Sequence, residues 1–232
     1  MLVVSCKKEF KKLVVEDTAL ENKAFIKVYN GAVNTNRNFV YIDNVPLTGS
    51  ILAYGALFPS TGYTSTVEPG NHTVVIKDTL ATTTQKAVTF TSTFEAGKNY
   101  TIFTYDTVNA VKYKMVEDKI EIPSDTSARL RFVNLIYSST PLPNVDLYST
   151  RRNANLFSNI SLATVTDFIP FESNYIDTLY VRATGTTTNL TPLGTIRLTE
   201  KRSYTVVYRG RYGTTTPSTA PLLRSIAAFA NR

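Results

Sequence analysis

The sequence contains one cysteine, one histidine and no tryptophan in 232 residues. A single cysteine cannot form an internal disulfide, so the packing of side chains must stabilise the fold. Zinc sites need several His, Cys or carboxylate ligands, and the lone His72 cannot supply such a set, so we expect a structural or surface histidine. No stretch approaches the roughly 18 consecutive apolar residues of a membrane-spanning helix, so no transmembrane helix is expected.

Motifs of known catalytic chemistry are also missing. The sequence has no Gly-rich phosphate loop, no Gly-x-Ser-x-Gly motif and no Asp-x-Asp-x-Asp calcium loop. Glu117, Asp118 and Glu121 form an acidic cluster, and paired carboxylates can hydrolyse glycosides. Because this cluster flanks a predicted linker, we expect its carboxylates to be solvated. The sequence therefore predicts a protein that is not an enzyme and that uses no cofactor or metal.

The net charge of +7 does not predict nucleic-acid binding. Four of the 25 basic residues lie within the first twelve positions, in an expected tether. Others are scattered singly on alternating strands, as in Lys27, Arg129 and Arg131, which predicts solvated strand faces. Nucleic-acid binding needs a basic stripe with interleaved aromatics, and only RGRYG at 209–213 resembles one. We expect no nucleic-acid partner.

Cys6 lies within Val3-Val4-Ser5-Cys6, a match to the bacterial lipobox. In that motif a small residue precedes the cleavage point, and the cysteine thiol takes up diacylglycerol. Acyl chains partition into a bilayer at about 0.8 kcal/mol per buried CH₂, so several chains anchor a protein stably. We therefore predict lipidation of Cys6 and a membrane as a partner through this lipid anchor.

The apolar stretch before Cys6 is short. A signal peptide needs about 7–15 apolar residues before the cleavage site, and only Leu2, Val3 and Val4 precede Ser5. Lipidation of Cys6 therefore requires an upstream leader that this sequence does not include. The alternative is an ordinary exposed cysteine near the N-terminus.

The chain repeats itself. Residues 24–30 (AFIKVYN) align with residues 128–134 (ARLRFVN), an offset of 104 positions, and the two segments share their first alanine and last asparagine. The same offset aligns 82–84 with 186–188, and 99–105 with 203–209. Three matches in one register predict two homologous domains.

The repeat sets the expected domain boundaries. We predict a lipobox remnant and flexible tether over 1–23, a first β-sandwich domain over 24–120 and a second over 128–232. Residues 121–127 (EIPSDTS) are expected to form the linker, because Pro123 and small polar residues separate the two copies.

Apolar and polar residues alternate with period two along 24–30 and 128–134, which predicts strands with one face toward a core. About seven short strands per copy, without helical periodicity, indicate an all-β fold of two tandem immunoglobulin-like β-sandwich domains. The other expected strands are 38–42, 51–57, 63–67, 72–77, 88–94, 99–106, 111–117, 144–148, 156–160, 165–171, 177–183, 193–198, 203–209 and 223–229.

Two tyrosines occupy the position of a tyrosine corner. FEAGKNY at 94–100 has the apolar-x-x-Gly-x-x-Tyr spacing in which a tyrosine hydroxyl bonds back to the backbone. The second copy, at 198–204, keeps the apolar residue and the tyrosine but has Lys201 in place of the glycine. We therefore predict structural roles for Tyr100 and Tyr204.

Two segments resemble the domain-of-unknown-function family 4397. LAYGALFPSTGYTSTVEPGNHTVVI at 52–76 is similar to its central motif, and ARLRFVNLIYSSTPLPNVDLY at 128–148 is similar to its opening. The resemblance implies two copies, over about 24–118 and 128–232, in an exported lipoprotein of the Bacteroidota type, with no established activity. Asp146 in the second segment is expected to be a strand-edge residue that caps a turn.

Asp-Thr followed by alanine, leucine or valine occurs four times and resembles the O-glycosylation sequon of exported Bacteroidota proteins. Thr18, Thr79 and Thr107 are the candidate acceptors, and Thr18 is expected to be the most accessible because it lies in the tether. Thr178 falls within an expected strand.

Together these observations predict a non-enzymatic lipoprotein of the bacterial cell envelope, expected in the outer membrane, with a structural, adhesive or ligand-presenting role. Its ligand is an unknown protein or glycan. The alternative is a surface glycan-binding accessory protein, in which some of the 14 tyrosines would form a stacking platform. Against this alternative, tryptophan, the usual stacking residue, is absent.

Overall fold

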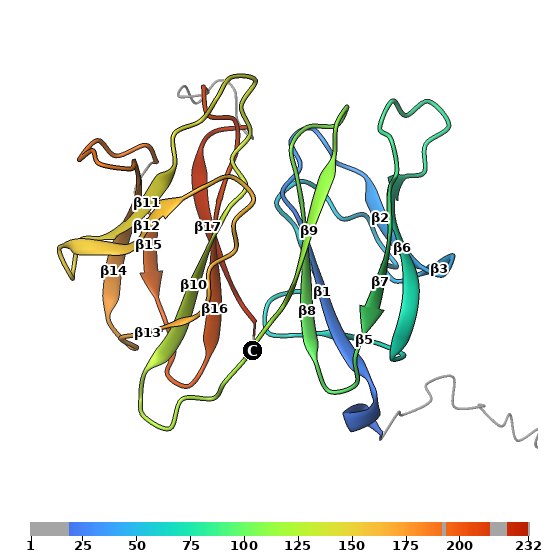
Figure 1. The fold of residues 1–232 in the computed structure, drawn as a ribbon, viewed down its shortest axis with the longest axis horizontal. Coiled ribbons are helices and arrows are strands. Elements are labelled where there is room, and N and C mark those ends of the chain that lie inside the picture. The colour runs from blue at the N-terminus through green and yellow to red at the C-terminus, as the bar shows by residue number, and fades with distance from the viewer. Residues whose placement is uncertain (1–18, 192–193, 214–221, 232) are drawn as a thin grey trace, which may run out of the picture.

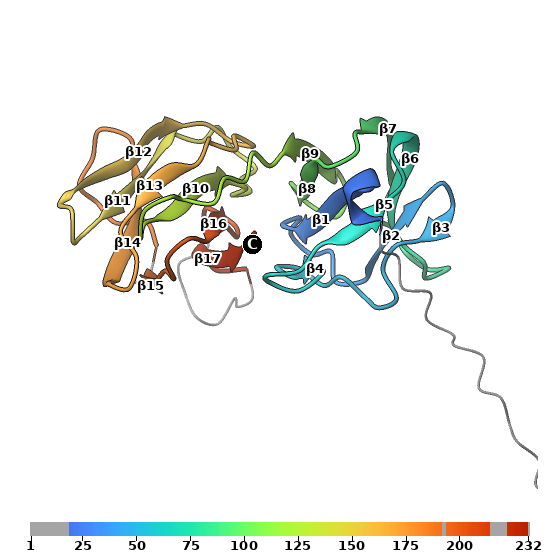
Figure 2. The same cartoon turned by 90° about the horizontal axis from the view of Figure 1, so that it is seen from below.

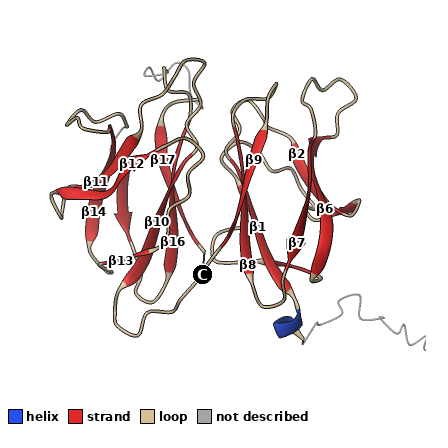
Figure 3. Ribbon diagram, viewed as in Figure 1, coloured by secondary structure: helices blue, strands red, loops and turns tan. Residues whose placement is uncertain are grey.

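The computed structural model describes residues 19–191, 194–213 and 222–231. These residues form seventeen strands and one 3-10 turn, η1 (Leu20–Asn22), so the all-β prediction is confirmed. Figure 3 shows that strands and loops make up almost all of the ribbon. No helix in these residues is long and apolar enough to cross a membrane.

Residues 24–118, which we call the first half, form two sheets. One has the order β4-β1-β8-β9, with β5 also paired to β1, and the other has the order β3-β2-β6-β7. Ile26, Val28, Val74 and Ile102 are fully buried between the two sheets, so this half is a β-sandwich. Its strands are β1 (Ala24–Asn30), β2 (Asn38–Ile42), β3 (Val45–Pro46), β4 (Leu57–Phe58), β5 (Ser65–Val67), β6 (Gly70–Asp78), β7 (Val88–Phe94), β8 (Asn99–Tyr105) and β9 (Lys112–Glu117).

The second half, residues 128–231, repeats this layout in its described residues. Its sheets have the orders β13-β10-β16-β17 and β12-β11-β14-β15, and Leu130, Leu147, Val181 and Val206 are buried between them. Its strands are β10 (Ala128–Asn134), β11 (Val145–Ser149), β12 (Ala154–Ile160), β13 (Ile169–Phe171), β14 (Ile176–Ala183), β15 (Gly194–Arg197), β16 (Ser203–Arg209) and β17 (Ser225–Ala230).

The register of the central strand pair is the same in both halves. β1 pairs in parallel with β8, with Phe25 opposite Asn99, and β10 pairs in parallel with β16, with Arg129 opposite Ser203. Asn30 and Asn134, the last residues of β1 and β10, are both buried, and their side chains donate hydrogen bonds to the carbonyls of Leu52 and Ile160. The shared asparagine of the two repeated segments therefore makes a similar contact in each half.

The two halves face each other through the sheets that contain β1 and β10 (Figure 1). Figure 2 shows them side by side, joined by the segment between β9 and β10. The Tyr29 and Phe229 rings stack across the junction with centroids 5.7 Å apart. The buried apolar residues of this contact are Tyr29, Phe103, Val133, Leu135, Val207 and Phe229.

This contact corrects the expectation of solvated strand faces. Lys27 and Arg131 are only 1% and 2% exposed, and Arg129 is partly buried. The reason is that β1 and β10 bury both faces, one toward the core of their own half and one toward the other half. Period-two patterning cannot distinguish a polar residue that faces water from one that faces a second domain.

Most expected strands are present, and those at 38–42, 88–94 and 203–209 are confirmed residue for residue. The strand expected at 51–57 is wrong, because the chain turns at Gly55 with φ +78°, and only Leu52 forms an isolated bridge before β4. β3 was not expected. It follows a two-residue turn at Asp43 and Asn44, both of which have positive φ.

Candidate functional site

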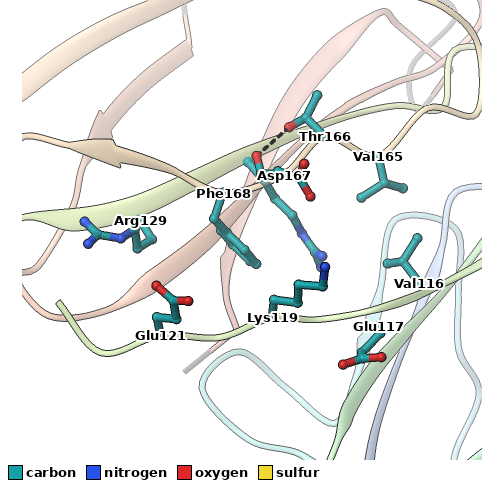
Figure 4. A pocket seen from close by; sticks show the side chains of 10 residues that line it. Val116, Glu117, Lys119, Glu121, Arg129, Val165, Thr166, Asp167 and Phe168 are labelled. Carbon is teal, nitrogen blue, oxygen red and sulfur yellow. Dashed lines mark hydrogen bonds between the residues drawn. The ribbon is translucent and has the colours of Figure 1, made fainter.

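A cleft of about 390 Å³ opens where the two halves meet. Val116, Glu117 and Lys119 line it from β9 and the segment that follows, and residues 165–168 line it from the segment before β13 (Figure 4). Its charged residues are of both signs: Lys119, Arg129 and Arg131, with Glu117, Glu121 and Asp167. The cleft therefore offers mixed charge to a partner rather than a field of one sign.

A buried ion pair joins the halves where Arg131 lines the cleft. Arg131 Nη1 lies 2.6 Å from Asp118 Oδ1, and the two side chains are 2% and 1% exposed. Arg131 Nε also donates to Thr205 Oγ1 at 2.8 Å, and its guanidinium lies 4.7 Å from the centroid of the Phe168 ring. Thr101 Oγ1 donates to the second oxygen of Asp118 at 2.6 Å. Both charges are thus satisfied by fixed partners.

This ion pair corrects the expectation of a solvated acidic cluster. Glu117 and Glu121 are exposed as expected, but Asp118 is 4% exposed because the second half covers it. Glu117 forms an ion pair with Lys98 at 3.2 Å. Asp118 and Glu117 are therefore held by different partners, Arg131 and Lys98.

Lys27 is the counterpart of Arg131 at the offset of 104 residues, and it has a different environment. Its Nζ is buried and makes no hydrogen bond to the described residues. Burial lowers the pKa of Lys27 to about 8, because water no longer solvates the ammonium, and the charge of Asp118 opposes this shift only in part.

Asn231 takes the place in the second half that Asp118 has in the first. The backbone N–H of each donates to the carbonyl at the start of the neighbouring strand, Asn99 and Ser203, at 2.7 Å. Thr205 Oγ1 lies 2.6 Å from Asn231 Oδ1, as Thr101 does from Asp118. The contact between the halves therefore buries two cations but only one carboxylate.

Arg209, at the end of β16, reaches the first half at Tyr54 and Gly55. Its guanidinium lies 5.2 Å from the centroid of the Tyr54 ring. Gly55 has φ +78°, and a Cβ added there would lie 1.3 Å from Arg209 Nη1, so a side chain at this position would strain the backbone and displace the guanidinium. The arginine of the RGRYG segment and the Tyr-Gly pair of the 52–76 segment thus meet at the junction of the halves.

Burial raises the pKa of Tyr29, which lies beside this contact, because the phenolate would lose its hydration, and the charge of Arg209 opposes the shift. Tyr54 Oη and Arg209 Nε are buried and form no hydrogen bond with the described residues.

The hydroxyls of Tyr100 and Tyr204 each accept a hydrogen bond from the backbone N–H five residues earlier, of Glu95 and Thr199, at 3.1 Å. Lys201 has φ +57°, and the glycine at the equivalent position of the first half has φ +74°. The lysine therefore adopts the same left-handed backbone conformation, so the turn before Tyr204 forms without a glycine.

His72 connects two elements of the first half. Its Nδ1 lies 2.5 Å from Asp43 Oδ2, and its Nε2 lies 2.8 Å from the carbonyl oxygen of Glu68. The N–H of Thr73 and the imidazole of His72 lower the pKa of Asp43, because both donate hydrogen bonds to its carboxylate. The described residues contain no group of three or more His, Cys, Asp or Glu that could hold a metal ion.

The proposed modification sites remain predictions. Cys6 and Thr18 lie outside the described residues. Thr79 is exposed directly after β6, whereas Thr107 is partly buried in a bridge to Val33.

Asp146 does not lie at a sheet edge, because β11 is an inner strand. Its carboxylate accepts hydrogen bonds from Asn155, Asn159 and Thr184 at 2.8–2.9 Å. It therefore holds the irregular register between β11 and β12 rather than capping a turn at an edge.

Sequence reasoning missed the junction of the halves as a site. The available signal was a basic residue at the same position of two otherwise apolar repeated strands, Lys27 and Arg131. A basic residue at the same position of both repeated strands indicates that this face of each strand has a similar environment.

Comparisons with known proteins give distant structural similarities and one family. A carbohydrate-binding module of family CBM26 from Eubacterium rectale Amy13K, solved with maltoheptaose, is 14% identical, with a TM-score of 0.28, 85% of this chain covered and 98% of the other. A provisionally assigned cell adhesion protein from Bacteroides eggerthii is 10% identical, with a TM-score of 0.22, 90% of this chain covered and 96% of the other. No curated protein matches the chain. The family described as "Domain of unknown function (DUF4397)" matches residues 24–148, more than half of the chain, and the protein belongs to that family.

Proposed function

We propose that this protein is a lipid-anchored, non-enzymatic module of the bacterial cell envelope, with a structural or adhesive role. The observation that carries the proposal is the junction of the halves. Six apolar residues and the Arg131–Asp118 ion pair are buried there, so the two sandwiches form one extended body with its other sheets turned outward. Such a body suits presentation of a binding surface away from a membrane.

We further propose that each half is a copy of the family domain. The family model matches residues 24–148, which include only the beginning of the second half. The proposal that the second half is a further copy therefore depends on other observations. These observations are the common offset of 104 residues, the identical register of β1–β8 and β10–β16, and the equivalent hydrogen bonds of Tyr100 and Tyr204.

The anchor is proposed to be diacylglycerol on Cys6, with the protein in the outer membrane. The test is expression of the chain behind a lipoprotein signal peptide, with Cys6→Ser as the matched control. We expect membrane fractionation and an intact mass that includes acyl chains for the natural chain only. A membrane-bound Cys6→Ser variant, or a natural chain without acyl mass, would contradict the anchor.

The ligand class is tested with the purified chain on a glycan array and in pull-downs of envelope proteins. We propose a protein ligand, because the exposed tyrosines lie on separate elements and form no row. Tyr63 lies before β5, Tyr113 in β9 and Tyr175 before β14. Retention of an envelope protein without glycan binding is the expected result. Glycan binding that is lost on replacing these tyrosines would instead support the glycan-binding alternative.

A further inference from the structure

The sheet edges of this fold differ in how they are protected against pairing with another strand. An edge presents unpaired backbone groups, and proteins usually shorten, charge, bulge or cover it. β3 and β4 have two residues each, and β13 has three, including Pro170. β15 has four residues and ends at Arg197. These four edges are too short to bind an added strand well.

Three longer edges are protected in other ways. β9 carries two lysines and a glutamate. β12 has an irregular register against β11, and Asn159 within it has positive φ. β17 is covered at its end by the first half, where Ala230 N–H donates to Thr61 Oγ1 at 2.8 Å and its carbonyl accepts from the N–H of Gly62.

β7 lacks all of these protections. Its seven residues, VTFTSTF, include no charge and no proline, and its register against β6 is continuous. Its threonine side chains at 89, 91 and 93 are exposed. Among the edges in the described residues, β7 is therefore the one that is long, regular, uncharged and not covered by the other half.

The direction of the free backbone groups of β7 follows from its neighbours. The N–H of Thr73 donates to the carboxylate of Asp43 and its carbonyl accepts from the N–H of Asp43, so Thr73 faces β2. Backbone direction alternates along a strand, so Val74 faces β7, and its partner Phe90 faces β6. The backbone groups that point to the open edge are those of Thr89, Thr91 and Thr93. They have no hydrogen-bond partner among the described residues.

The exposed threonines of β7 are placed symmetrically about Thr91. In an antiparallel pair centred there, Thr91 lies opposite Thr91 and Thr89 opposite Thr93, so the free N–H and C=O groups of one strand meet those of the other. Threonine pairs on a sheet surface are favourable, and no like charges are apposed. At the ends of the pair, Lys86 of one copy comes next to Glu95 of the other.

The surroundings leave room for an incoming strand. A groove of about 360 Å³ runs beside β7, and Thr91 lines it together with the stacked rings of Phe90 and Tyr113. The centroids of these rings are 3.7 Å apart, so the aromatic pair closes the core of the sandwich behind the edge. We propose that β7 pairs edge to edge with β7 of a second copy of this chain, which joins two four-stranded sheets into one.

This inference goes beyond the proposed function, because it depends neither on the lipid anchor nor on the number of family copies. The test is sedimentation equilibrium of the full chain under reducing conditions, which prevent cross-linking through Cys6. A single edge pair is a small interface, so we expect a monomer–dimer equilibrium with a dissociation constant of roughly 10 μM to 1 mM.

Two lysine variants locate the interface. Thr91→Lys places two ammonium groups directly opposite each other, so the dissociation constant should rise about fivefold or more. Thr73→Lys is the matched control, because Thr73 is the cross-strand partner of Thr91 on β6 and lies one strand in from the edge. It should leave the dissociation constant unchanged.

Two double variants test the register. In Thr89→Lys/Thr93→Lys, lysines oppose lysines twice, and the dissociation constant should rise about tenfold or more. In Thr89→Lys/Thr93→Glu, each lysine opposes a glutamate, and the dimer should be at least as stable as that of the natural chain. Circular dichroism checks that all variants stay folded.

Three results would overturn the proposal. The first is a natural chain that stays monomeric at about 1 mM. This result would overturn the proposal even if β7 bound an unrelated strand peptide. The second is an equal effect of Thr91→Lys and Thr73→Lys. The third is equal dimerisation of the two double variants, which would rule out pairing centred on Thr91.

Discussion

The buried ammonium of Lys27 gives a quantitative prediction. Its pKa falls from a usual value of 10.5 to about 8 on folding. Since one pKa unit corresponds to 1.36 kcal/mol, keeping Lys27 charged near neutral pH costs roughly 3 kcal/mol of folding free energy. Methionine has a similar length, no charge and no hydrogen-bonding group. Lys27→Met should therefore raise the free energy of unfolding at pH 7 by up to about 3 kcal/mol.

The dependence on pH has a definite sign. Between pH 8 and 10.5 the unfolded chain keeps the proton on Lys27, whereas the folded chain has released it. Because the unfolded state then binds more protons, the free energy of unfolding should rise with pH across this window. Lys27→Met should remove this rise in the free energy of unfolding. The difference in stability between the variant and the natural chain should therefore shrink as pH approaches 10.5.

Urea unfolding followed by circular dichroism at a series of pH values measures both effects. Lys86→Met is the control, because Lys86 is exposed and the substitution removes the same charge. It should leave both the stability at pH 7 and its pH dependence nearly unchanged. If Lys27→Met destabilised the chain at pH 7, or kept the rise between pH 8 and 10.5, the argument from desolvation would be refuted.

Four other substitutions test the described contacts. Asp118→Asn leaves a buried guanidinium without its counter-charge and should cost about 3–5 kcal/mol in urea unfolding. Gly55→Ala should destabilise the chain by more than about 2 kcal/mol, because the methyl group meets Arg209 and the backbone has positive φ; Arg209→Ala in the same chain should recover the steric part of the loss. The stability that Asp43 contributes is present above the usual carboxyl pKa and is lost as pH falls through its lowered value. In thermal unfolding at a series of acidic pH values, Asp43→Asn should therefore reduce the fall of Tm with decreasing pH. An unchanged fall of Tm would argue against a role for the His72 contact.

Local patterns were enough to predict the strands and the class of the fold. The period-two alternation of 24–30 and 128–134 depends on neighbouring residues only, and both segments form central strands. The same reasoning failed at 51–57, where the apolar composition indicated a strand. A left-handed residue at Gly55 and the close approach of Arg209, more than 150 positions away, shape that segment instead.

The junction of the halves could not be predicted in the same way. Lys27, Arg131 and Asp118 are charged residues on amphipathic strands or beside a linker, and such residues are usually solvated. Their burial depends on which faces of two distant sheets meet. That choice is made by the sum of many contacts, including Tyr29 on Phe229, and no single segment encodes it.

Arg131 has a carboxylate partner and Lys27 has none among the described residues, and this difference follows from the chemistry of their side chains. At the contact between the halves, Asp118 and Asn231 hold equivalent places, and Asn231 Nδ2 lies 3.4 Å from Asp118 Oδ2. One carboxylate must therefore serve two buried cations. A guanidinium cannot release its proton in a protein, whereas a lysine can do so when it is desolvated. The carboxylate pairs with the arginine, the cation that cannot become neutral, and the lysine is left with the lowered pKa. One carboxylate shared by two cations thus leaves the contact with a folding cost that a change of protonation can relieve.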